Sequence, residues 1–459
     1  MIFETRSVYA TSVSIPWIKI ILSVLVATLG IWISLRRRNK ISRRGEILVD
    51  KLPGPKALPF LGNVLDLRVE NEDFMDLLGD LCRKWGGIFR VWYFNNPWVM
   101  VTSVDDVQKL YSSPSGKNLS DKRKRLRLRN RLLGADCTLE TVENIRNIYH
   151  ERRKLLNPGF GISLIRKGIP KANLQSARIS YYHTRRVFKP WLRPDVVFNL
   201  TEGSKLAQEG IQFLNDFARK AVNERRKDWQ KKKGLFLKSN FIESDSNEEN
   251  GKDEDWECYV DFLFEQQEKG LLTEKDVQEE FSVFTVGGYE TTSMVLTNTL
   301  FLLGTYPEQQ AKVVAELDDV FGKGFDASSF EVTMDHVKQL KHLDFCVKEV
   351  LRLYPPVQCL QRKIMKIFSL VDPEAFIPER FSPDSKHYRE KGSYAFIPFS
   401  VLPRSCPGQN YGMVNNKVFL AYLLKAYEWT TVTPRDKLKM SYQYTNHPKN
   451  SILTVKPRL

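Results

Sequence analysis

The strongest constraint on the fold is a helical pattern that begins at Thr273 and continues to about Leu303. Thr273 and Asp276 form a variant of the capping box, with apolar residues placed on either side for a hydrophobic staple. Gly304 and then Pro307 end the pattern. A helix of roughly thirty residues is about 45 Å long, which is enough to cross a whole domain.

Paired glycines, Gly287 and Gly288, interrupt this helix in its middle. A glycine inside a helix costs roughly 1 kcal/mol relative to alanine, so a sequence that keeps two of them needs space at that point. A ligand could approach the backbone there, next to Glu290, Thr291 and Thr292, whose side chains could hold and transfer protons. The alternative is ordinary close helix packing, with the hydroxyl groups bonded to carbonyl groups one turn earlier.

A second helical segment carries Glu349 and Arg352, which share a helix face, and Pro355 and Pro356 end it. The pair is either a weak contact on the surface or a buried pair that needs further partners. Arg380, in the sequence Pro-Glu-Arg-Phe, could be one of those partners.

A lone cysteine, Cys406, lies in a loop between Phe399 and Gly408, with Arg404 as its basic neighbour. A lone cysteine is most often an inert apolar residue. A turn-rich loop of this kind can nevertheless hold a thiolate and direct backbone N–H groups at its sulfur. A further segment, residues 149–154, combines aromatic and basic residues and by itself is typical of a solvated helix face.

Residues 16–35 are apolar apart from Lys19 and are long enough to cross a bilayer core of roughly 30 Å. Basic residues crowd the segment that follows, so the positive-inside rule puts the body of the chain in the cytosol. We predict a short lumenal N-terminus over 1–15, a transmembrane signal anchor over 16–35, a basic stretch and proline-rich hinge over 36–58, and one large domain over 59–459.

Composition narrows the function classes. The chain has 70 lysines and arginines against 54 acidic residues, a net charge of +16, which suits an acidic partner. The six cysteines are scattered without a CxxC pair, so neither a zinc ribbon nor a disulfide scaffold is supported. The basic run 122–131 lacks interleaved aromatic residues, which argues against nucleic-acid binding.

Coarse patterns place three further elements. The sequence predicts a strand–turn–strand hairpin that turns at 95–97, a helix capped by Ser103, and an amphipathic helix from about Leu200 to Glu224.

In this order along the chain, the segments resemble the cytochrome P-450 superfamily, in particular its membrane-anchored microsomal members of the family-4 type. The resemblance covers most of the chain, from the anchor and hinge to the C-terminus. It implies a mainly α fold with small β-sheets (α+β), as a single large domain behind one N-terminal transmembrane helix.

The resemblance also implies roles for individual residues. Thr291 would hold the bound oxygen and, with Glu290 and the neighbouring Thr292, deliver protons, while Cys406 falls where the family has the axial thiolate ligand of the haem iron. The other matching positions are a structural group, Glu349, Arg352 and Arg380, and residues of the haem site, Arg153, Arg362, Arg404, Phe399 and Gly408. Tyr149 stands where the family's motif around Arg153 has tryptophan.

By this resemblance the chain is a haem-thiolate monooxygenase of the endoplasmic reticulum membrane. It would insert one oxygen atom of O2 into a lipophilic substrate such as a fatty acid, a hormone or a xenobiotic. Electrons would come from NADPH through a membrane-bound reductase, whose acidic face would suit the basic body, with cytochrome b5 as a second partner. Gly287 stands where many family-4 members carry a glutamate linked covalently to haem, so we expect non-covalent haem b.

The chain departs from the family in two respects. Leu402 stands where the cysteine loop has a glycine, and a side chain has no room there if the position needs positive φ or close approach to the porphyrin. The intervals from Glu349 to Cys406 and from Arg153 to Thr291 are short. Two alternatives therefore stay open: a degenerate or truncated relative with impaired haem binding, and a membrane-anchored basic binding protein.

Overall fold

The computed structural model describes residues 43–112, 195–240, 259–357, 374–385, 396–401 and 405–458, with gaps at 60, 68, 71–72, 95, 325, 327–329 and 443–444, and in addition residues 23, 189, 192 and 364–365. The predicted membrane segment at 16–35 lies outside the described residues, apart from Ser23. Within the described part of the chain, no helix combines the length and the apolar character needed to span a membrane.

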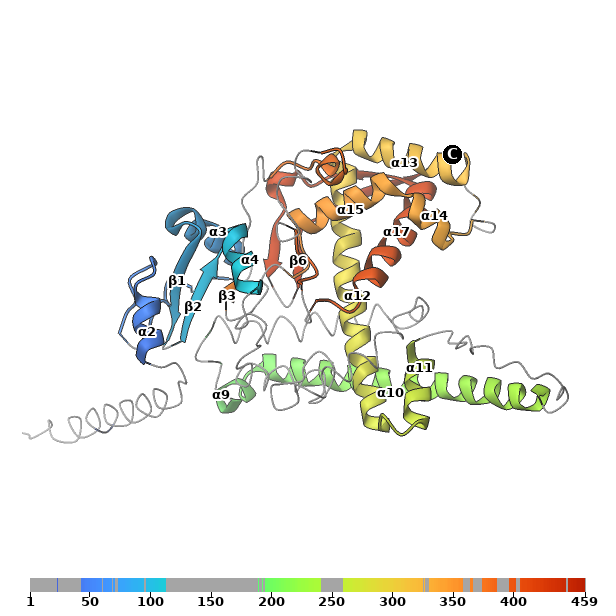
Figure 1. The fold of residues 1–459 in the computed structure, drawn as a ribbon, viewed down its shortest axis with the longest axis horizontal. Coiled ribbons are helices and arrows are strands. Elements are labelled where there is room, and N and C mark those ends of the chain that lie inside the picture. The colour runs from blue at the N-terminus through green and yellow to red at the C-terminus, as the bar shows by residue number, and fades with distance from the viewer. Residues whose placement is uncertain are drawn as a thin grey trace, which may run out of the picture.

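The predicted long helix is confirmed as α12 (Glu274–Thr305), which runs through the molecule in Figure 1. Its capping box is complete: the N–H of Asp276 donates to Thr273 Oγ1 at 3.2 Å, and the N–H of Thr273 donates to Asp276 Oδ2 at 2.9 Å. The helix packs against other elements along most of its length, so it is the axis around which the rest of the described structure is arranged.

Gly304 lies inside α12, and the prediction that it ends the helix is wrong. A Cβ atom at Gly304 would lie 2.7 Å from Thr431 Oγ1 and 2.9 Å from the Thr431 nitrogen. Thr431 belongs to strand β4 (Tyr427–Thr431), which crosses the helix at this point. The glycine is therefore needed for the close approach of a strand, which no local pattern reveals.

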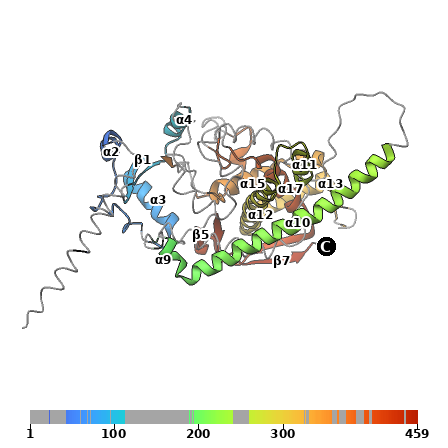
Figure 2. The ribbon, with the colours of Figure 1, turned by 90° about the horizontal axis from the view of Figure 1, so that it is seen from below.

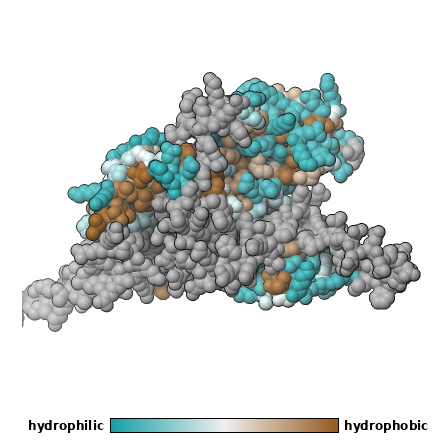
Figure 3. All heavy atoms as spheres, viewed as in Figure 1, coloured by the Kyte–Doolittle hydropathy of each residue, from teal (hydrophilic) through white to brown (hydrophobic). Residues whose placement is uncertain are grey.

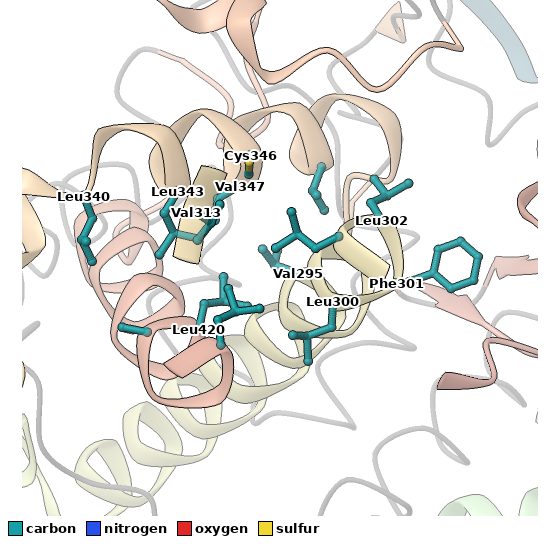
Figure 4. Close-up of a cluster of buried hydrophobic side chains, with 14 of the residues drawn as sticks. Val295, Leu300, Phe301, Leu302, Val313, Leu340, Leu343, Cys346, Val347 and Leu420 are labelled. Carbon is teal, nitrogen blue, oxygen red and sulfur yellow. The ribbon is translucent and has the colours of Figure 1, made fainter. Parts of the chain in front are cut away.

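The main hydrophobic core surrounds the C-terminal half of α12. It is built with three further helices: α13 (Pro307–Phe321), α15 (Lys341–Leu353) and α17 (Gln409–Ala426). The short helix α14 (Met334–Gln339) packs against α13 and α17. Leu302, Leu343, Val347 and Leu420 are fully buried in it, and Figure 4 shows how these side chains converge from separate helices. This core holds α15 and the start of α17 at fixed positions relative to α12.

A second core surrounds the N-terminal half of α12 and includes α10 (Glu202–Asn240) and α11 (Tyr259–Glu268). The short helix α9 (Asp195–Asn199) packs against α10, and the far end of α10 projects from the body in Figure 2. The predicted end of this helix at Glu224 is wrong. The helix continues because Arg225 faces α11, where its Nε donates to Asp261 Oδ1 at 2.7 Å.

The sheets are small. β1 (Ile88–Tyr93) and β2 (Asn96–Val101) form the predicted hairpin, and β3 (Ile364–Met365) lies parallel to β2. The other pairs are antiparallel: β4 with β7 (Leu453–Pro457), and β5 (Met440–Tyr442) with β6 (Asn446–Pro448). The remaining described elements are the helices α2 (Arg43–Asp50), α3 (Phe74–Trp85) and α4 (Val104–Ser112), and the 3-10 helices η4 (Pro378–Phe381) and η6 (Arg435–Lys437).

The prediction of a mainly helical fold with small β-sheets is confirmed for the described residues. Ser103 also caps α4 as expected, because its Oγ accepts from the N–H of Asp106 at 3.3 Å.

Candidate functional site

A buried group of charges lies near the C-terminal end of α15. The Glu349 carboxylate has no exposed surface, and Arg352 donates to it twice, from Nε to Oε2 at 2.7 Å and from Nη2 to Oε1 at 2.8 Å. Arg380 Nε lies 3.4 Å from Oε1, and the N–H of Ile377 donates to the same oxygen at 3.0 Å. The interpretation of Glu349 and Arg352 as a weak surface contact is therefore wrong. We call Glu349, Arg352 and Arg380 the buried triad.

The start of α15 is held in place by Glu316 of α13. The Glu316 carboxylate accepts the N–H groups of Lys341 and His342 at 2.7 Å each and that of Leu343 at 3.0 Å. These belong to the four N–H groups that the first turn of a helix leaves without partners. The other end of the helix projects Glu349 and Arg352 toward the 3-10 helix η4, which carries Arg380.

The loop with Cys406 leads directly into α17. The N–H of Cys406 donates to the carbonyl oxygen of Phe399 at 2.8 Å and closes the loop, while Gly408 is the N-cap of the helix. Ser400 in this loop has a φ of 62°, a left-handed conformation that is costly for a residue with a Cβ atom. Cys406 itself is exposed. The fold thus presents one cysteine in a tightly turned loop at a helix N-terminus.

The other two cysteines that the structure describes differ from Cys406 in accessibility. Burial raises the pKa of the half-buried Cys82 to about 11. Burial also raises the pKa of the Cys346 thiol well above its ordinary value. A thiol must lose its proton before it can ligate a metal. Cys406 is therefore the best placed of the three to be a ligand.

Among the residues that the structure describes, the glycine pair in α12 has no close neighbour. No described atom would lie within 4 Å of a Cβ atom added at Gly287 or Gly288, so close packing against the described elements does not account for these two glycines. The other part of that interpretation is correct for Thr291, whose Oγ1 donates to the carbonyl oxygen of Gly287 at 2.7 Å. Thr292 is buried. The open glycine face and the Thr291 hydroxyl therefore share one stretch of the helix.

An aromatic contact ties this stretch of α12 to the cysteine loop. Phe284 lies one turn before the glycine pair, and its ring centroid is 5.8 Å from that of Tyr411, in the first turn of α17. The helix pair also shares the main hydrophobic core. Two motifs that are far apart in sequence are thereby brought side by side.

Glu290 makes contacts that no sequence pattern indicated. Its Oε1 accepts the Thr445 hydroxyl at 2.6 Å and lies 3.2 Å from His447 Nε2. Thr445 and His447 stand 155 and 157 positions away from Glu290 in the sequence. Neither belongs to a recognisable motif, so no signal in the sequence could have found them.

Three predicted haem-site residues, Arg153, Arg362 and Arg404, lie outside the described residues, as do Leu402 and Tyr149. The other predicted residues fall into two groups. Glu290, Thr291 and Thr292 stand on α12, which packs against α17, the helix that follows the loop with Phe399, Cys406 and Gly408. The buried triad Glu349, Arg352 and Arg380 supports the end of α15.

The described residues fit a haem group with one cysteine ligand. A haem iron needs a single axial thiolate from the protein. Cys406 supplies an exposed thiol just before α17, where the helix dipole and the unpaired N–H groups favour negative charge. The open face at Gly287 and Gly288 leaves the space that a flat group needs against the backbone of α12.

Comparison with known proteins points to one family. The cytochrome P450 family model matches residues 174–372 and 366–455. The chain is 27% identical to cytochrome P450 4c3 of Drosophila melanogaster, over 92% of this chain and 91% of that protein. It is 25% identical to cytochrome P450 4c21 of Blattella germanica (95% and 99% covered) and 30% identical to cytochrome P450 4V2 of Rattus norvegicus (60% and 55% covered).

The alignment with cytochrome P450 4c3 extends over 504 positions, more than the 459 residues of the chain. The alignment therefore leaves positions of that relative without a counterpart here, in agreement with the short intervals in the sequence. The matched residues nevertheless include α12, the buried triad and the cysteine loop, and on this ground the chain belongs to the cytochrome P450 family of haem-dependent monooxygenases.

Proposed function

We propose that the chain is a haem-thiolate monooxygenase with Cys406 as the axial ligand of a non-covalently bound haem b. The observation that carries the proposal is the exposed Cys406 thiol just before α17, whose first turn contacts α12 through Tyr411 and Phe284, one turn before the glycine pair. The buried triad supports the same assignment, because it fixes the end of α15 from which the chain continues toward the cysteine loop.

When bound, the haem would activate O2, and thiolate ligation would favour cleavage of the O–O bond. The chain's own residues have simpler tasks. Cys406 binds the group, and the backbone at Gly287 and Gly288 leaves room for it. The Thr291 hydroxyl, now bonded to the Gly287 carbonyl oxygen, can rotate to hold a proton over the open face. Glu290 is the nearest carboxylate in the sequence that can supply such a proton. Arg153, Arg362 and Arg404 are proposed to contact the haem propionates.

The substrate proposed is lipophilic: a fatty acid, a hormone or a xenobiotic. The donor proposed is NADPH, through a membrane-bound reductase, with cytochrome b5 as a second partner, and the net charge of +16 supports an acidic docking face on the reductase. We assign no role in nucleic-acid binding.

A location in the endoplasmic reticulum membrane, with residues 16–35 as the anchor, 36–58 as the hinge and 59–459 as a cytosolic catalytic domain, is part of the proposal. Apolar side chains exposed near α2 support it, and Figure 3 shows apolar surface in that region. They are Ile47, Leu48, Leu58, Leu61 and Leu65. Such a surface, which begins within the hinge, is suited to contact with lipid.

The test is the absorption spectrum of the reduced, carbon-monoxide-bound chain. The wild type should give the Soret band of thiolate-ligated haem, Cys406→Ala should abolish it, and the matched control Cys82→Ala should retain it. A wild type without that band would overturn the proposal.

A second candidate function is that of a degenerate family member that binds haem poorly. It is favoured by the positions of cytochrome P450 4c3 that have no counterpart in this chain. The same spectrum separates the two candidates. A folded wild-type chain that takes up no haem, or whose band lies at shorter wavelength, would establish the degenerate relative.

A further inference from the structure

A buried polar cluster joins the middle of α12 to the strand β6. The Glu290 side chain is 6% exposed and the His447 side chain 17% exposed. Thr445 Oγ1 lies 2.6 Å from Glu290 Oε1 and 2.8 Å from His447 Nε2, and His447 Nε2 lies 3.2 Å from Glu290 Oε1. Three polar atoms thus form a closed triangle with little access to solvent.

The hydrogen positions in this triangle follow from the chemistry of the groups. Thr445 Oγ1 donates its single hydroxyl hydrogen to Glu290 Oε1. The Thr445 oxygen can then only accept from His447. His447 Nε2 must therefore carry a hydrogen, which it shares between the Thr445 oxygen and the Glu290 carboxylate. Both side chains direct a donor at the same carboxylate oxygen.

The strand that carries these donors is itself anchored. The N–H of Asn446, between Thr445 and His447, donates to the carbonyl oxygen of Pro356 at 2.9 Å, just beyond the end of α15. β6 also pairs with β5, where Tyr442 lies opposite Asn446. The donors are thus presented by backbone that is fixed at two places, which favours a single position of the Glu290 carboxylate.

Glu290 and Thr291 are neighbours in the sequence, but their side chains bond in different directions. Glu290 bonds to the hairpin of β5 and β6, whereas Thr291 bonds to the carbonyl oxygen of Gly287 on the open face. Successive residues on a helix are separated by about 100° around its axis. The carboxylate that the proposed function pairs with Thr291 is therefore held by a different element.

We propose that His447, together with Thr445, is a positioning residue for Glu290, and that the two hold its carboxylate on the hairpin side of α12. Loss of either donor weakens this hold and lets the carboxylate shift toward the open face and Thr291. This inference rests on the proposed function for its consequence at the haem, but the contact itself does not depend on haem.

The experiment uses the full-length, haem-loaded chain in phospholipid nanodiscs with carbon monoxide as the probe. The infrared C–O stretching band reports the electrostatic field on the open side of α12. His447→Leu removes one donor and should move the band to higher wavenumber, because a less firmly held carboxylate brings negative charge closer to the probe. His447→Gln keeps an N–H donor at a similar reach and should restore the wild-type band.

Two further variants complete the design. Thr445→Val removes the second donor at constant shape and should shift the band in the same direction, which keeps the test decisive if His447→Leu does not fold. His342→Leu is the matched control, since His342 is also partly buried and bonded to one side chain, Gln309, at 3.0 Å. It should leave the band unchanged. A band that stays in place in both His447→Leu and Thr445→Val, or a shift that His447→Gln does not reverse, would overturn the inference.

Denaturant unfolding gives a readout that does not involve the bound probe. In Glu290→Gln and His447→Leu the shifts in unfolding midpoint should not add, because both variants break the same contact. If the wild type has the thiolate band and the shifts of the two variants add, the inference is refuted and the proposed function is not. A wild type without the band refutes the proposed function, while the unfolding cycle still tests the contact between Glu290 and His447.

Discussion

Glu349 carries a charge that has no exposed surface, and two guanidinium groups and one backbone N–H compensate for it. A charge in such a place is tolerated only when nearly all of its hydrogen-bonding capacity is used. Arg352 in turn bonds to the carbonyl oxygen of Ala375 at 3.0 Å. The group therefore connects α15 to the segment before η4 through side chains and backbone together.

Replacing Glu349 with Gln should lower the free energy of unfolding by about 3–5 kcal/mol, because it leaves Arg352 and Arg380 as buried charges without a counter-charge. The measurement is chemical denaturation of the full chain. Glu428→Gln on β4, where the side chain is exposed, is the control and should change stability by less than about 0.5 kcal/mol. Equal stability of the two variants would mean that the buried triad does not hold α15 in place.

Alkylation should distinguish the cysteines at the residue level. Cys82, with a pKa of about 11, is only about 0.1% thiolate at pH 8, and Cys346 is buried. We expect iodoacetamide to modify Cys406 at least about tenfold faster than Cys82 or Cys346 in the haem-free chain. Mass spectrometry of each peptide measures the rates. Haem loading should protect Cys406 alone, and alkylation of Cys406 in the loaded chain at its haem-free rate would argue against ligation.

At the scale of the element, α12 shows how one helix uses glycine in two ways. Gly287 and Gly288 meet open space, whereas Gly304 meets the backbone and side chain of Thr431. The long helix can therefore serve as a surface for a ligand in its middle and as a close packing partner for β4 near its end. The same residue type has opposite energetic consequences at the two places.

Substitution by alanine should reveal this difference. Gly304→Ala should lower the free energy of unfolding by about 1–3 kcal/mol, since its Cβ atom overlaps with Thr431. Gly288→Ala should raise the free energy of unfolding of the haem-free chain by about 0.5–1 kcal/mol, because alanine favours the helix and its Cβ atom meets none of the described residues. Thermal or denaturant unfolding of the two variants tests the pair, and a stabilising Gly304→Ala would contradict the packing observed at β4.

At the scale of the whole molecule, two features suggest contacts with partners: an excess of positive charge over the chain, and a small exposed apolar surface near α2. The net charge of +16 extends over the chain, while the exposed apolar residues of that surface belong to the N-terminal part of the described structure. Charge and apolar surface thus suggest two different contacts, one with an acidic protein and one with lipid.

If an acidic reductase binds this chain, its affinity should depend on salt. Raising the salt concentration from about 0.05 M to about 0.3 M should weaken the complex roughly tenfold, or about 1.4 kcal/mol, because screening shortens the range of the attraction. Surface plasmon resonance with the anchored chain measures the change, and bovine serum albumin, which is also acidic, controls for non-specific attraction. Binding that is independent of salt would contradict an electrostatic docking face.

Much of this protein could be predicted from local sequence. The capping box of α12, the hairpin of β1 and β2, and the cap of α4 are specified by residues within a few positions of one another, and the structure contains all three. Cys406, Glu349 and Arg352 could be named as candidate site residues because each stands in a short local motif, and their roles at a haem stay predictions.

Only the tertiary structure decided the rest. The role of Gly304 depends on β4, and the length of α10 depends on Asp261 of α11. The position of the Glu290 carboxylate depends on His447 in β6 and on Thr445, the residue before that strand. Each of these contacts joins residues that are far apart in the chain. Local propensity cannot specify them, since their energy comes from burial and from hydrogen bonds that exist only when the folded core brings the two elements together.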